Sequence, residues 1–192
     1  MSELSLTDAM SSLASELCAA LAYYANALTT PRASCLADIS ECNRRGASLT
    51  ADMHARLFTA FCPPLPRTQS VAFCETLHGT IEGVFYAAML LSADYHPSAR
   101  LDTVAGGLVR MSELIKQEVD TLPCVVRGRG VSLPDPHAYH AELTRVRAAL
   151  ALYVTHGERS RAECLAVQGA ATVADALQQV YTAWLSLFAE AI

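Results

Sequence analysis

Three polar side chains that can bind metal ions lie between residues 75 and 82. Glu75, His78 and Glu82 stand at positions i, i+3 and i+7, a spacing that puts them on one side of an α-helix. Iron and zinc both accept a mixture of imidazole and carboxylate ligands. The stretch therefore predicts one of two things: an iron or zinc site completed by another helix, or a solvated polar flank of a bundle helix.

Other catalytic and metal-binding patterns are incomplete. Glu75-x-x-His78 is half of the signature of a di-iron bundle, and the chain has no second E-x-x-H. His137 and His140 stand at i and i+3, but no third or fourth ligand is evident. The chain contains neither a G-x-S-x-G nucleophile elbow nor a G-x-x-x-x-G-K phosphate loop. We therefore expect that the protein is not an enzyme.

The residues around this stretch predict a helical hairpin. Apolar side chains recur at helical spacing over residues 36–60 and again over residues 77–91. Between them, residues 63–66 include three prolines, which cannot continue a helix and push their predecessors toward extended geometry. Two antiparallel helices joined by a tight turn follow from this pattern.

The hairpin resembles the first repeat of the PhoU-like phosphate-transport regulators, in the branch often found beside Pit-type phosphate transporters. Leu49-Thr50 stands where that family has Ile-Thr, and Phe61, Pro64 and Arg67 fit its F-x-x-P-x-x-R turn. The resemblance is clear over roughly residues 36–91. It implies a regulator that contacts a transporter or signalling partner and carries acidic metal sites.

Most of the acidic ligands that the resemblance implies are replaced in this chain. The residues at the family's E-x-x-x-D and D-D-x-x-D positions are Asn43, Ala47, His78, Gly79 and Glu82. Asp52 and His54 have the wrong helical phase to replace both acids lost from the first helix. In the second half, the resemblance places Glu142 and Asp175 at the equivalent acidic motifs. We thus expect a degenerate metal site.

Helical periodicity extends over the rest of the chain and predicts an all-α fold. We expect six helices, the first preceded by a Ser5–Asp8 capping box, the fourth beginning at Pro97 and the fifth at Pro136 after an Asp135 N-cap. Residues 123–134 read as irregular. The resemblance implies an elongated six-helix bundle in a single domain, built from two three-helix halves of about residues 1–95 and 96–192.

Composition narrows the environment and the partners. A net charge of −5 argues against nucleic acid as a partner. The content of charged residues, 17%, is low for a soluble surface and predicts a homo-oligomer, most simply a homodimer. Seven cysteines without a C-x-x-C fit a reducing compartment. With no basic region and apolar stretch at the N-terminus and no apolar run near 20 residues, we expect a cytoplasmic protein.

Three functional hypotheses remain after these exclusions, of which the third is a metal-binding bundle with redox work. The first is a PhoU-like regulator or accessory protein of inorganic phosphate transport. It would act by protein–protein contact with a phosphate transporter or signalling protein and would associate with the membrane only through a transporter. The second, an alternative to it, is a metal-free helical adaptor or dimerisation module unrelated to phosphate.

Overall fold

The computed structural model describes residues 5–30, 35–60, 63–91, 95–128, 135–155 and 160–191. These residues form helices and no strands, which confirms the predicted all-α class. The six long helices are α1 (Leu6–Thr29), α2 (Leu36–Thr59), α3 (Arg67–Met89), α4 (Asp102–Val119), α6 (Pro136–Thr155) and α7 (Arg161–Ala191). A 3₁₀ helix, η1 (Ala99–Leu101), precedes α4, and the short helix α5 (Leu122–Val126) follows it.

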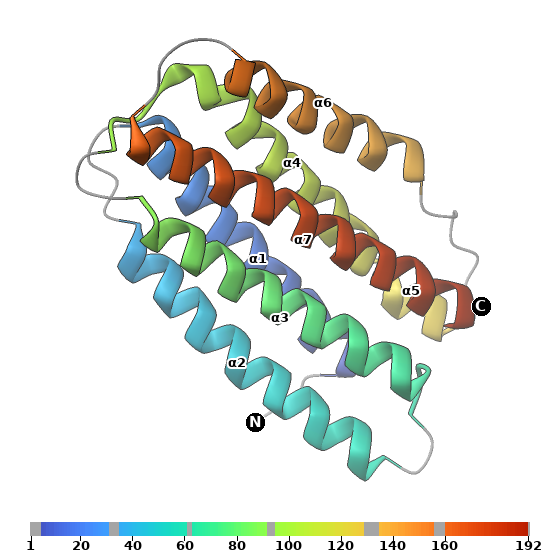
Figure 1. Ribbon diagram of the computed structural model, residues 1–192. Helices are drawn as coiled ribbons and strands as arrows, with labels where there is room; N and C mark the ends of the chain where they lie inside the picture. Colours follow the sequence, from blue (N-terminus) through green and yellow to red (C-terminus); the bar gives the residue numbers. More distant parts are fainter. Residues whose placement is uncertain are drawn as a thin grey trace.

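The long helices lie along one another in an elongated bundle, with α2 at one edge and α6 at the opposite edge (Figure 1). The most extensive contacts join the two halves, because α3 packs on α7 and α1 packs on α4. Within each half the same scheme recurs: α1, α2 and α3 contact one another, as do α4, α6 and α7. The predicted arrangement of two three-helix halves is therefore confirmed. One difference stands out, since α6 contacts α7 much less than α2 contacts α3.

Several helix ends follow directly from the sequence. The Ser5 hydroxyl accepts a hydrogen bond from the Asp8 backbone N–H at 3.2 Å, and the Asp8 carboxylate accepts one from the Ser5 N–H. The backbone N–H of His137 donates to Asp135 Oδ1 at 2.9 Å. Each bond satisfies a donor that the first helical turn leaves unpaired. The predicted caps of α1 and α6 are confirmed.

Two boundary predictions are wrong. The fourth helix does not begin at Pro97, because Ser98 is the N-cap of η1 and its hydroxyl accepts from the N–H of Arg100 at 3.3 Å. The N–H of Ser98 and the hydroxyl of Tyr95 both donate to the carbonyl of Leu28, which ties this segment to the end of α1. The segment predicted to be irregular begins with helix α5, and its residues 129–134 lie outside the described residues.

The turn between α2 and α3 is held by an arginine side chain. Arg67, the first residue of α3, donates from Nη2 to the carbonyl of Ala60 at 2.7 Å. Ala60 is the C-cap of α2, where carbonyls lack partners within the helix. This bond gives the arginine of the predicted turn motif a physical role, while Phe61 lies outside the described residues.

One aromatic cluster anchors the contact between α3 and α7. Trp184 is fully buried, with its ring centroid 5.7 Å from those of Phe73 and Phe188.

Helices α4 and α6 approach each other closely at Gly107, where a Cβ would lie 2.3 Å from Val146 Cγ2. The adjacent Gly106 differs, because a Cβ there would meet nothing within 4 Å.

The surface carries several large apolar side chains. Those exposed are Tyr23, Leu36, Phe58, Tyr86, Met89, Leu90, Val126, Leu152 and Val154. Scattered apolar side chains are normal on soluble proteins, and larger groups of them mark contact surfaces. No helix in the described parts of the chain combines the length and apolar character needed to cross a membrane.

Candidate functional site

The three residues of α3 that were predicted to bind metal differ in their exposure to solvent. Glu75 and Glu82 are exposed, whereas His78 is half-buried and its Nε2 has no hydrogen-bond partner among the described residues. The two carboxylates therefore lie on the solvent side of the helix while the imidazole is turned inward. Across the described residues, no three His, Cys, Asp or Glu side chains lie close enough to share a metal ion. The expected three-ligand cluster is thus not assembled in this arrangement.

His54 on α2 is the residue that faces Glu75. Its Nε2 lies 3.8 Å from Glu75 Oε1, which is an ion-pair distance when the imidazole is protonated and too long for a hydrogen bond. Sequence reasoning set His54 aside on helical phase alone. The register of the hairpin could have predicted this pairing. His54 and Glu75 lie almost equally far along the chain from Pro64, so an antiparallel hairpin that turns there brings them opposite each other.

Several polar atoms without hydrogen-bond partners in the described part of the chain belong to α2 and α3, and two of their residues, His54 and His78, lie at the contact between these helices. We call this group the α2–α3 polar seam. Its buried atoms without a hydrogen-bond partner in the described residues belong to Asn43, Thr50, His54, Ser70 and His78. A buried polar group left unpaired costs about 1–3 kcal/mol. The seam is therefore a place where a buried water molecule would be stabilised.

Gly46 lets the seam form. A Cβ at this position would lie 3.1 Å from His78 Cδ2 and 3.2 Å from Ile81 Cδ1, so only glycine leaves ordinary contact distances. The ring of His78 thus packs against the backbone of α2. The seam occupies the hairpin face on which the family resemblance places acidic residues, and Asn43 and His78 stand there as neutral or weakly basic groups.

Two buried thiols belong to these helices, Cys42 to α2 and Cys74 to α3. Burial raises the pKa of Cys74 to about 12, and its Sγ lies 3.5 Å from the sulfur of Met53. Burial likewise raises the pKa of Cys42 to about 11. Both pKa values lie above the ordinary thiol value, so burial disfavours a free thiolate nucleophile at either position.

The acidic residues placed in the second half form ion pairs instead of a cluster. Glu142 Oε2 lies 2.7 Å from Nη2 of Arg145, one turn further along α6. Asp175 on α7 accepts from Nη2 of Arg147 at 2.7 Å, and the same nitrogen donates to Gln178. The structure therefore does not bring Glu142 and Asp175 together as ligands. The Glu142–Arg145 pair follows the i,i+3 spacing within one helix, whereas the Arg147–Asp175 pair depends on how α6 lies against α7.

We make a direct prediction for metal content. Protein purified without a histidine tag should contain iron or zinc well below one equivalent per chain, because His78 and the two glutamates face different surroundings. Glu82→Ala should leave that content unchanged. The measurement is elemental analysis of both proteins. Stoichiometric iron or zinc that falls in the variant would show that α3 retains a working metal site.

Comparisons with known proteins identify a similar fold but no sequence family. The sequence matches no protein-family model and no curated protein. The structure is similar to the crystal structure of a PhoU-like protein from Shewanella oneidensis MR-1, with a TM-score of 0.69 and 14% sequence identity. The likeness covers 96% of this chain and 99% of that chain. The chain therefore has a PhoU-like helical fold over nearly its whole length.

Proposed function

We propose that this protein is a non-enzymatic PhoU-like regulator or accessory protein of inorganic phosphate transport. Its partner would be a phosphate transporter or signalling protein in the cytoplasm or at its membrane face, reached by protein–protein contact. The observation that supports this proposal is the structural likeness to a PhoU-like protein across both helical halves. The turn residues Pro64 and Arg67, which the family resemblance singled out, agree with it.

The hairpin edge of the bundle is the surface best suited to such a contact. Phe58 on α2 is 67% exposed, and its ring lies 6.3 Å from that of His54 in the polar seam. An exposed aromatic ring offers apolar area to a partner. Contact energy at this edge would come from covering Phe58.

Co-purification and transport assays test the proposal together. In a host that depends on one phosphate permease, the chain should co-purify with that permease and change the rate of labelled phosphate uptake. Phe58→Ser should reduce the recovered permease by roughly threefold or more, since one interface aromatic commonly contributes more than about 1 kcal/mol.

Val154→Ser supplies the matched control for this assay. Val154 is 57% exposed on α6, the helix at the opposite edge of the bundle from α2 (Figure 1). It should leave both recovery and uptake unchanged. If the chain neither co-purifies with the permease nor alters uptake, or if the two variants behave alike, phosphate transport by contact at this edge is wrong.

Exposed apolar groups favour a second candidate, the helical adaptor or dimerisation module. Tyr86 and Met89 are 63% and 55% exposed near the end of α3. A homodimer that covers them accords with the low charge content of the chain. A mass of 20.6 kDa measured by sedimentation would show a monomer and would contradict a homodimer in either proposal.

A further inference from the structure

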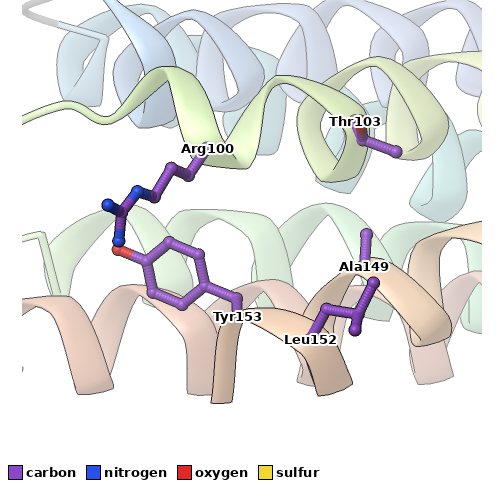
Figure 2. Close-up of a pocket in the computed structure, with 5 residues that line it drawn as sticks. All are labelled: Arg100, Thr103, Ala149, Leu152 and Tyr153. Carbon is purple, nitrogen blue, oxygen red and sulfur yellow. The ribbon is translucent and has the colours of Figure 1, made fainter. Parts of the chain in front are cut away.

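A second feature, independent of the polar seam, lies between η1, the first turn of α4 and the last turns of α6. It is a hollow of about 480 Å³ lined by Arg100, Thr103, Ala149, Leu152 and Tyr153. This volume is within the range of about 300–1,000 Å³ that is usual for small-molecule sites. In Figure 2, the side chains of Arg100 and Thr103 border the hollow from one side, and those of Ala149, Leu152 and Tyr153 border it from the other.

The two ends of the hollow differ in chemistry. At one end, the guanidinium group of Arg100 reaches toward the phenol oxygen of Tyr153 (Figure 2). Away from that end lie Thr103 and the apolar side chains of Ala149 and Leu152. No carboxylate is among the described residues that line it, and within the described residues no ion pair is formed by Arg100. A cationic end beside an apolar wall is complementary to an amphipathic anion.

The walls are held in place from outside the hollow. Arg100 is carried by η1, whose Leu101 is fully buried and whose N-cap Ser98 is tied to the end of α1. The Tyr153 hydroxyl donates to Glu163 Oε1 on α7 at 3.2 Å, which orients the phenol ring. A site whose walls are fixed before binding loses less conformational entropy when a ligand enters.

From this arrangement we propose that the hollow binds a small carboxylate carried on an aliphatic body. One guanidinium fork matches one carboxylate, with two parallel hydrogen bonds. A dianion such as phosphate would leave a charge uncompensated and would not cover Leu152, which is 61% exposed. The aliphatic body would lie along Ala149 and Leu152.

Octanoate is the probe, with 1-octanol and acetate as ligands that lack its charge and its aliphatic body, respectively. Ligand-observed NMR at low ionic strength should give saturable octanoate binding, with a Kd at least fivefold lower than for either control, as expected for a charge-assisted hydrogen-bonded pair at a partly exposed site. Shifts of assigned Ala149 and Leu152 methyl signals locate the ligand. Added salt should weaken octanoate binding and leave octanol unaffected.

Paired variants assign the charge. Arg100→Gln should raise the octanoate Kd by roughly fivefold or more and bring it to that of octanol. Arg110→Gln, an exposed arginine on α4 with the same change in net charge, should leave it unchanged. Leu152→Ser tests the apolar wall without touching the charge and should also weaken binding. Circular dichroism checks that all three remain folded.

Three results would overturn the proposal. These are the absence of saturable octanoate binding, octanol binding as tightly as octanoate, and equal losses in the Arg100 and Arg110 variants. None of them bears on contact with a permease at the α2–α3 edge, which Phe58→Ser tests separately.

Discussion

Trp184→Ala is expected to lower the free energy of unfolding by about 3–5 kcal/mol, the usual cost of emptying a large aromatic site in a core. The indole is fully buried between Phe73 of α3 and Phe188 of α7. These are the helices with the most extensive contact in the bundle, so neighbouring side chains have little freedom to fill the space. Urea unfolding followed by far-ultraviolet circular dichroism measures the change.

Trp184→Phe is the matched control for this prediction. Phenylalanine keeps an aromatic ring in the cluster and removes the indole N–H, which lies near the Glu118 carboxylate without meeting hydrogen-bond geometry. We expect a smaller loss than for the alanine variant, because less of the volume of the indole is left empty. A loss below about 1 kcal/mol for the alanine variant would contradict the packing described for Trp184.

Gly107→Ala and Gly106→Ala should change stability in opposite directions although the two residues are adjacent. At Gly107 the new methyl group would lie 2.3 Å from Val146 Cγ2, so α4 and α6 must move apart. Overpacking of this kind costs about 1–3 kcal/mol. Gly106 is exposed and open, and alanine there should stabilise the helix by up to about 1 kcal/mol through its higher helix propensity.

A double-mutant cycle tests the cause of the effect at Gly107. Val146→Ala alone should be destabilising because it removes buried methyl groups. Combined with Gly107→Ala, it should cost less than the sum of the two single changes, because the two methyl groups no longer collide. Additive losses, or equal effects at Gly106 and Gly107, would mean that the close approach of α4 and α6 is not what excludes a side chain.

Local signals in the sequence were sufficient for the six long helices and for the caps of α1 and α6, but not for the short helix α5. Ser5 and Asp135 cap as predicted because each bond forms within one helical turn. Pro97 failed as a helix start because Ser98 supplies a side-chain cap just after it, an outcome set by contacts with the end of α1. Local rules thus hold where the competing interactions are also local.

The candidate sites depended on relations between helices that one sequence does not contain. His54 faces Glu75 because of the register between two antiparallel helices, which periodicity within either helix does not fix. The pairing of Arg147 with Asp175 likewise joins two helices, α6 and α7, and was missed. The hollow at Arg100 exists only because of how the end of α6 lies against η1 and α4. The positions of the long helices along the sequence were predictable. The rotation of each helix about its axis and its offset relative to its neighbours were not.

The pairing of α1 with α4 and of α3 with α7 has a consequence for biosynthesis. Helices α1 to α3 leave the ribosome first, and their faces directed toward the second half remain uncovered until α4 and then α7 have been made. At about 5–20 residues per second, that interval lasts several seconds or more. The first three helices therefore pass through a period as an incomplete, apolar-faced intermediate, in which chaperone engagement or pairing with another nascent chain competes with correct closure of the bundle.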